Sequence, residues 1–154
     1  MTLFKGAGVA LVTPFSEGHV DYGSLAGLLD WQVSSGIDAI VSCGTTGEAS
    51  TLNDEEHINT VKFTVDAVKK KVPVIAGAGS NDTGHAVFMA QELEKVGADG
   101  LLIVTPYYNK CTQRGLIKHY EKIADSVNIP IILYSVAGRT GVNISPSSVA
   151  ALSR

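Results

Sequence analysis

The sequence predicts an α/β protein built on parallel strands, because short apolar runs alternate with amphipathic helical stretches along its 154 residues. The apolar runs are continuous rather than alternating, as expected for parallel strands covered on both faces. The segments between them show helical periodicity, with apolar residues three and four positions apart. Two architectures fit: a doubly wound sheet that is complete with five strands, or part of a (βα)8 (TIM) barrel.

The five strands and the helices between them can be placed in chain order. The strands are expected at Gly8–Thr13, Ala39–Ser42, Val74–Ala76, Gly100–Thr105 and Ile131–Tyr134. Asn53, which three acidic residues follow, is a good helix N-cap, and Asp82 offers a similar start. Gly36 and Gly97 each follow a helical stretch, where a left-handed residue often ends a helix. A fifth helix is expected to begin near Pro146.

Composition describes a single globular domain over residues 1–154, with 45% hydrophobic and 18% charged residues. The net charge of -3, with its one basic run at an expected helix end, predicts no nucleic-acid partner. No apolar run approaches the ~18 residues of a membrane span, so no membrane partner is expected. Cys43 and Cys111 form no metal-ligand pattern. We expect no metal, no organic cofactor and a cytoplasmic location.

Candidate functional residues follow three of the strands, at the carboxyl ends where ligand sites of parallel α/β proteins lie. The loop Gly44-Thr-Thr-Gly-Glu48 offers backbone N–H groups and two hydroxyls to a carboxylate or a phosphate, although such turns are often purely structural. The adjacent Tyr107 and Tyr108 suit packing or an oligomer contact. Arg139 on a glycine-flanked loop can bind a carboxylate through two hydrogen bonds, or remain an idle surface residue.

Taken together, these loops resemble the dihydrodipicolinate synthase/N-acetylneuraminate lyase family in order and spacing. The matching segments are Gly44-Thr-Thr-Gly-Glu48, Val104-Thr-Pro-Tyr-Tyr-Asn109, and Tyr134 followed by Gly138-Arg-Thr-Gly141. The last segment is similar to the dihydrodipicolinate synthase branch of the family. The resemblance implies a (βα)8 barrel lyase that forms a Schiff base with pyruvate and joins it to aspartate semialdehyde in lysine biosynthesis. It therefore favours the barrel over the doubly wound sheet.

The resemblance also implies roles for individual residues at matching positions. Tyr134 would transfer protons beside the nucleophile, and Thr45 would link it to Tyr108 of a neighbouring subunit. Thr46 and Gly44 would hold the pyruvate carboxylate, and Arg139 would meet the carboxylate of the second substrate. The family's lysine-feedback site would correspond to Ala49, His57, Asn81, His85 and Tyr107. For His57 and His85 we prefer the simpler interpretation of ordinary helix-surface residues.

One feature of the family is missing from the sequence, namely the Schiff-base lysine on the sixth barrel strand. Only Lys110 falls at the ligand-binding end of the predicted strands, and its solvated loop position would keep its amine protonated. We therefore expect a partial barrel of about five βα units, truncated before the sixth strand and inactive alone. Its open strand edges predict a homo-oligomer or pairing with a C-terminal half-barrel.

Three functional hypotheses remain at this stage. The first is an enzyme part that supplies the proton relay and the carboxylate-binding loops of a pyruvate-dependent lyase. The second is a non-catalytic truncated relative that binds a small carboxylate or a full-length subunit. The third, an unrelated doubly wound ligand-binding domain, leaves the spacing of the three loops to chance.

Overall fold

The structure, a computed structural model, describes residues 3–153 of the chain. Its main sheet has five parallel strands in the order β1-β4-β5-β6-β7, so neighbours in space are also successive along the chain. The strands are β1 (Gly8–Ala10), β4 (Ala39–Ser42), β5 (Val74–Gly77), β6 (Gly100–Val104) and β7 (Ile131–Tyr134). A doubly wound sheet reverses its strand order at a switch point, and this sheet does not. The order is that of a barrel wall.

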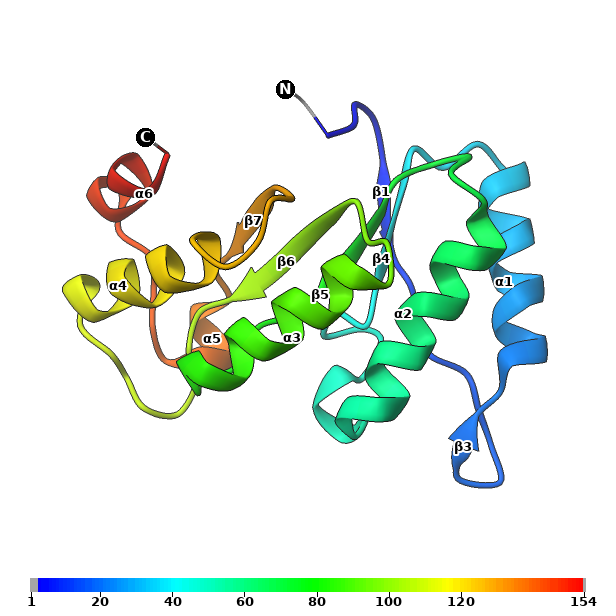
Figure 1. Ribbon diagram of the computed structural model, residues 1–154, viewed down its shortest axis with the longest axis horizontal. Helices are drawn as coiled ribbons and strands as arrows, with labels where there is room; N and C mark the ends of the chain where they lie inside the picture. Colours follow the sequence, from blue (N-terminus) through cyan, green and yellow to red (C-terminus); the bar gives the residue numbers. More distant parts are fainter. Residues whose placement is uncertain (1–2, 154) are drawn as a thin grey trace.

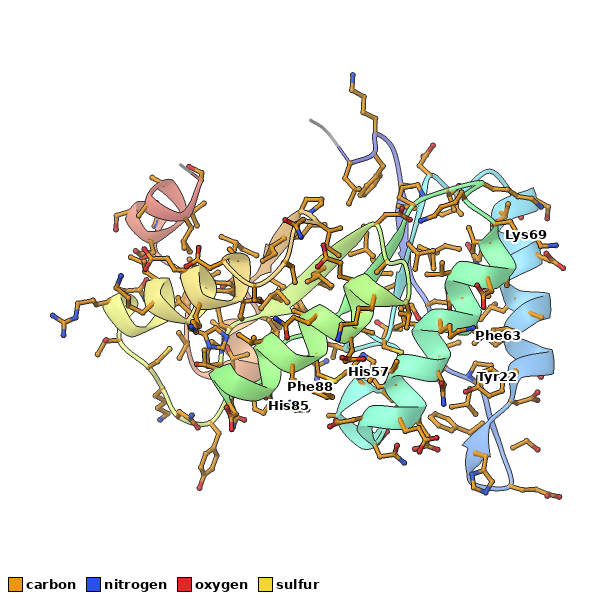
Figure 2. The ribbon with its side chains drawn as sticks, viewed as in Figure 1. Tyr22, His57, Phe63, Lys69, His85 and Phe88 are labelled. Carbon is orange, nitrogen blue, oxygen red and sulfur yellow. The ribbon has the colours of Figure 1, made fainter. Side chains whose placement is uncertain are left out.

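The helices form one continuous layer. They are α1 (Tyr22–Ser34), α2 (Asp54–Val68), α3 (Thr83–Lys95), α4 (Gln113–Ala124) and α6 (Pro146–Leu152). Each packs on the next, α1 on α2, α2 on α3, α3 on α4 and α4 on α6, and Figure 1 shows α2, α3 and α4 in a row along the sheet. Between α1 and α2 the rings of Tyr22 and Phe63 meet at 4.9 Å between centroids (Figure 2).

The expected helix boundaries are confirmed by their caps. Asn53 accepts a hydrogen bond from the Glu56 N–H, and the Glu56 carboxylate bonds back to the Asn53 N–H, which forms a capping box. The Asp82 side chain accepts from the backbone N–H groups of Gly84 and His85 at the start of α3. Lys69 follows α2 as its C-cap in the left-handed region, so the basic run does lie at a helix end.

Two aspartates, each just before a strand, accept hydrogen bonds from the backbone of a neighbouring segment. Asp38, before β4, accepts a hydrogen bond from the Ala7 N–H at 2.8 Å. Asp99, before β6, accepts from the Val74 N–H at 2.9 Å and pairs with Lys70 at 2.8 Å. In each case a glycine with positive φ, Gly36 or Gly97, ends the preceding helix, as expected. The amino ends of the strands are thus tied to their neighbours by side chains.

Three short elements were not expected from the sequence. The first strand ends at Ala10 rather than Thr13, and a hairpin of β2 (Phe15–Ser16) and β3 (His19–Val20) follows it. Glu17 and Gly18 both have positive φ there, the geometry of a tight hairpin turn. A single turn of 3-10 helix, η1 (Ala49–Thr51), precedes α2, and the Arg139 segment forms a short helix, α5 (Ala137–Thr140), rather than an open loop.

The outer strands of the sheet have open edges, as expected. Within residues 3–153, β1 and β7 each pair with a strand on one side only. All four residues of β7 are half-buried, whereas all four of β5 are buried. Beyond β1, Val12 and Phe15 are 51% and 41% exposed. Beside β7, an apolar hollow of about 220 Å³ opens between Tyr120, Leu133 and Leu152.

Candidate functional site

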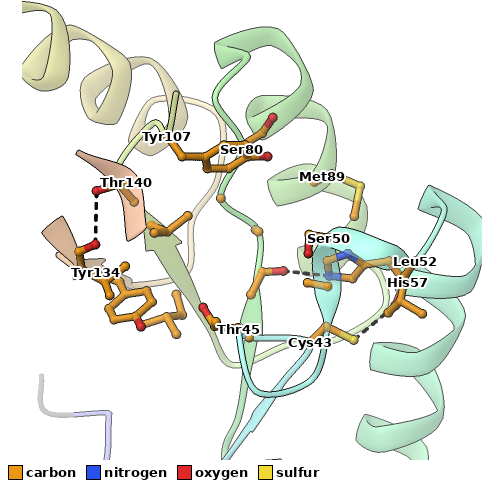
Figure 3. Close-up of a pocket in the computed structure, with 18 of the residues that line it drawn as sticks. Cys43, Thr45, Ser50, Leu52, His57, Ser80, Met89, Tyr107, Tyr134 and Thr140 are labelled. Atoms are coloured by element: carbon orange, nitrogen blue, oxygen red, sulfur yellow. Dashed lines mark hydrogen bonds between the residues drawn. The ribbon is translucent and has the colours of Figure 1, made fainter. Parts of the chain in front are cut away.

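A cavity of about 450 Å³ opens at the carboxyl ends of β4, β5, β6 and β7. It is the place where a parallel α/β protein binds its ligand. Figure 3 shows strand ends and helix starts converging on it from several sides. Eight of the residues proposed from the sequence line it: Gly44, Thr45, Ala49, His57, His85, Tyr107, Tyr134 and Arg139.

The loop after β4 is held in a strained but well-supported conformation. Cys43 is buried and has φ of 51°, a left-handed conformation that a residue with a side chain rarely adopts. The loop then closes through a hydrogen bond from the Gly47 N–H to the Gly44 carbonyl at 3.0 Å. The buried Thr13 hydroxyl donates to the Gly47 carbonyl at 2.7 Å and ties this turn to the chain beyond β1.

Close backbone packing beneath the cavity depends on Gly77 at the end of β5. A Cβ at this position would lie 2.0 Å from the Cys43 carbonyl oxygen, far inside van der Waals contact. The Gly77 carbonyl in turn lies 2.8 Å from Nε2 of His57. A carbonyl oxygen can only accept a hydrogen bond, so Nε2 of His57 carries a proton here. A side chain at position 77 would therefore collide with the left-handed turn at Cys43.

His57 is not the surface residue that the sequence suggested. It is 8% exposed and lies between α2 and the end of β5. Burial lowers its pKa, against the opposing effects of the Gly77 hydrogen bond and the nearby Asp54 carboxylate. The His85 side chain is 41% exposed, as a helix-surface residue would be, yet it lines the cavity, pairs with Asp54 at 3.0 Å and stacks on Phe88 (Figure 2). The two histidines therefore form one polar edge of the cavity.

The opposite side of the cavity is built on β6 and β7. The Thr105 N–H donates to the Tyr134 carbonyl at 3.0 Å, and the Thr105 hydroxyl donates to that of Thr140 at 3.0 Å. Tyr134 is half-buried and lines the cavity together with Thr45, which arrives from the β4 loop. Arg139 lines the same space from α5. Residues that carry a phenol, an alcohol and a guanidinium thus line one cavity, with Thr45 and Arg139 exposed, a set suited to proton transfer and carboxylate binding.

Three proposed residues do not line the cavity. Tyr108 is 90% exposed with φ of 72°, and Thr46 is exposed on the β4 loop. The Asn81 carbonyl accepts a hydrogen bond from the Asn109 side chain at 3.2 Å, which joins two loops beside the cavity. Lys110 is exposed, as expected.

The residues at the end of β5 were not predicted as site residues from the sequence. Gly77, Ala78, Gly79 and Ser80 follow or end β5 and all line the cavity. The rule used for the other loops, that sites lie just after parallel strands, would have included them. Cys43 also lines the cavity, but burial raises the pKa of its thiol to about 11, so it is no thiolate nucleophile.

Two kinds of feature are absent from the part of the chain that the structure describes. Residues 3–153 contain no group of three or more His, Cys, Asp or Glu side chains placed to hold a metal ion. Within the same range, no helix combines the length and apolar character required to cross a bilayer.

Fold and cavity together define the class of protein: five parallel strands of a (βα)8-type half-barrel, with a ligand cavity at their carboxyl ends. Residues 3–154 match the model of the dihydrodipicolinate synthetase family. The chain belongs to this family.

Relatives show how much of a family member the chain represents. It is 59% identical over 150 residues to 4-hydroxy-tetrahydrodipicolinate synthase of Geobacter metallireducens, covering 97% of this chain and 52% of that protein. The dihydrodipicolinate synthase of Acinetobacter baumannii, solved in complex with pyruvate, superposes with a TM-score of 0.96 at 46% identity, over 99% of this chain and 53% of that one.

A third relative was solved with lysine bound. This enzyme, from Cyanidioschyzon merolae, superposes with a TM-score of 0.96 at 39% identity, over 99% of this chain and 53% of the other. The chain thus spans about half the length of the relatives it matches, and its fold corresponds to the N-terminal half of their barrel.

Proposed function

We propose that this chain supplies the proton-relay and carboxylate-binding half of a pyruvate-dependent, Schiff-base lyase of the dihydrodipicolinate synthase type. The observation that carries the proposal is the convergence of Tyr134, Thr45 and Arg139 on one cavity. These groups come from two of the three segments that the sequence resemblance had already singled out, the loop after β4 and the end of β7 with the turn that follows it. The substrates would be pyruvate and aspartate semialdehyde, and the product would enter lysine biosynthesis in the cytoplasm.

The cavity suits the first half of such a reaction. Forming a Schiff base from a ketone and an amine requires a proton to be delivered to the departing oxygen and removed from nitrogen. Tyr134, whose main chain is fixed by Thr105, would carry that proton, with the Thr45 hydroxyl as its partner. The Gly44–Gly47 turn with Thr46 would hold the pyruvate carboxylate through hydroxyl and N–H groups. Arg139 would bind the carboxylate of the aldehyde.

The nucleophile would come from the remaining barrel strands, on the same polypeptide or on a partner chain. No lysine is among the cavity-lining residues of the described chain. The open edges of β1 and β7 and the apolar hollow beside Leu133 are where further barrel strands would pair and pack. We propose that a C-terminal half-barrel carrying the lysine completes the enzyme there.

A neighbouring copy would complete the proton relay. Tyr108 is too exposed to serve the cavity of its own chain, and its left-handed backbone projects it from the loop after β6. A side chain so placed suits insertion into the site of a second subunit, which makes a homo-oligomer part of the proposal.

A lysine-feedback site at the same cavity is the remaining part of the proposal. Ala49, His57, His85 and Tyr107 line the cavity, and Asn81 lies in the loop beside it. Asp54 also lines this end and offers a carboxylate that would attract an ammonium group.

A non-catalytic function remains the second candidate because no lysine lines the cavity. In that case the chain would bind a small carboxylate or a full-length subunit without turnover.

Complementation with a second half tests the first proposal. The chain would be co-expressed with the C-terminal half of the Geobacter metallireducens relative, and condensation of pyruvate with aspartate semialdehyde would be measured. Tyr134→Phe should lower kcat by about 100-fold or more, the usual contribution of general acid-base catalysis. Tyr22→Phe, on a ring that packs between α1 and α2, is the control and should leave kcat unchanged. Binding of pyruvate without turnover in the complemented pair would favour the second candidate.

A further inference from the structure

The turn that carries Arg139 is hydrogen-bonded to the rest of the molecule at two points, and Val142 and Ile144 beyond it are buried in the core. It belongs to the segment from Ser135 to Ser145, which connects β7 to α6. The first attachment is the buried pair of hydroxyls on Thr105 and Thr140. The second lies at the far end of the segment and comes from Gln113, a residue 30 or more positions away in sequence.

Gln113 uses both ends of its carboxamide at this second attachment. Its Nε2 donates to the Asn143 carbonyl at 2.8 Å. Its Oε1 accepts from the Ser145 N–H at 3.0 Å and from the Ser148 hydroxyl at 2.7 Å. Ser148 is 2% exposed, so one of these bonds is shielded from water. The site needs a donor and an acceptor at once, and the Gln113 carboxamide supplies both.

Helix α4 itself does not explain these contacts. Gln113 is its first residue, but the N-cap is Thr112, whose hydroxyl accepts from the Gly115 N–H. The Gln113 side chain bonds to the β7–α6 connection instead of to its own helix. Its contacts therefore serve the connection.

Little in α5 itself fixes Arg139, since the Ser135–Asn143 hydrogen bond and the buried Ile144 lie outside the helix. α5 is a four-residue helix without a side-chain N-cap, closed by the Gly141 N–H bonding to the Ala137 carbonyl at 2.8 Å. Within residues 3–153 the Arg139 side chain is in no ion pair. Arg139 is exposed and lines the cavity, so where its guanidinium can reach depends on the backbone beneath it.

We propose that Gln113 is a positioning residue that fixes the Arg139 turn at the mouth of the cavity and so sets affinity for the substrate carboxylate that Arg139 receives. This inference rests on the proposed function. Tyr134 should be insensitive to Gln113, because its main chain is held separately by the Thr105 N–H on the β6 side. The two halves of the reaction should then respond differently to a change at Gln113.

Gln113→Leu in the complemented enzyme tests this separation. The KM for aspartate semialdehyde should rise about tenfold, equivalent to one well-made hydrogen bond to a charged group. The KM for pyruvate and kcat should change less than about twofold. A general loss of folding would not produce such a selective change in one KM. Gln91→Leu, an exposed glutamine on α3, is the matched control and should change none of the three.

Hydrogen exchange provides a readout that does not depend on activity. In Gln113→Leu the amides of residues 141–145 should exchange at least about tenfold faster, while those of β6 stay unchanged. Unchanged exchange in that segment, or an equal rise in both KM values, would overturn the inference. If the unaltered pair shows no turnover, the proposed function fails, and the exchange comparison alone then decides whether Gln113 positions the turn.

Discussion

The hydroxyls of Thr105 and Thr140 lie 3.0 Å apart in the interior and join the end of β6 to the turn that carries Arg139. Both side chains are buried, at 0% and 4% exposure, so the bond is shielded from water. The Thr140 hydroxyl also lies 3.0 Å from the Val142 carbonyl, to which it donates. This small network connects the strand that precedes the tyrosine pair with the helix that presents the arginine.

Removing one hydroxyl of this pair should weaken the fold measurably. Thr105→Val keeps the shape of the side chain and deletes one neutral hydrogen bond, so the free energy of unfolding should fall by about 1 kcal/mol. Urea denaturation measures the change. Thr51→Val, on an exposed hydroxyl, is the control and should change stability by less than about 0.5 kcal/mol. An equal response in both variants would show that the buried pair has no special role.

Gly77 should be the least tolerant glycine beneath the cavity. Gly77→Ala places a methyl group 2.0 Å from the Cys43 carbonyl, so the free energy of unfolding should fall by about 3 kcal/mol or the chain should fail to fold. Gly27→Ala, inside α1 with open space around its Cβ, should instead raise stability by about 0.5–1 kcal/mol. Thermal melting of both variants checks the opposite signs. A Gly77→Ala protein as stable as the parent would contradict the packing described at Cys43.

Stability should decline as the pH falls below about 6.5, the ordinary histidine pKa. Burial lowers the pKa of both His57 and His119 in the folded protein. Between the lowered pKa and the ordinary one, the unfolded chain binds more protons than the folded chain, so stability rises with pH in that interval and is lost as pH falls through it.

His119 offers the sharper test of this pH dependence. Its Nδ1 lies 2.8 Å from the Thr83 hydroxyl, and its buried Nε2 has no hydrogen-bond partner within the described residues. His119→Gln should flatten the dependence of the urea midpoint on pH between about 7.5 and 5. His19→Gln, on the exposed hairpin, should leave the slope as it is. A parent protein with a flat profile would refute the assignment.

The two cysteines should differ in reactivity. Cys43 is buried with its thiol pKa raised to about 11, whereas Cys111 is half-buried in the loop before α4. At pH 8, a thiol reagent should therefore modify Cys111 quickly and Cys43 only as fast as the chain opens. Peptide mapping identifies the sites, and Cys111→Ser should remove the fast phase. Rapid modification of Cys43 in the folded chain would contradict its burial.

The strands were readable from the sequence because parallel strands covered by helices are continuous apolar runs. Ala39–Ser42 and Ile131–Tyr134 were predicted to the residue, and Asn53 and Asp82 gave the starts of two helices. The β2–β3 hairpin could not be foreseen, since its two-residue strands have no period to detect.

The site was predicted less completely, for reasons of tertiary structure. Tyr134, Thr45 and Arg139 could be named from loop position and resemblance, and all three line the cavity. The burial of His57 could not be predicted. Residues of α2 face the sheet or the solvent according to packing, which a single polar side chain does not reveal. The bonds of Gln113 to a segment 30 residues away leave no local signal.

Trapping the Schiff base shows which half of the barrel carries the reactive lysine. The chain would be incubated with pyruvate and borohydride, alone and with the complementary C-terminal half, and the intact mass of each polypeptide measured. We expect no adduct on this chain and a reduced pyruvate adduct on the C-terminal half. An adduct on this chain when it is incubated alone would show that the nucleophile lies here, at Lys110 on the loop after β6. That result would contradict the proposal that the C-terminal half-barrel supplies the lysine.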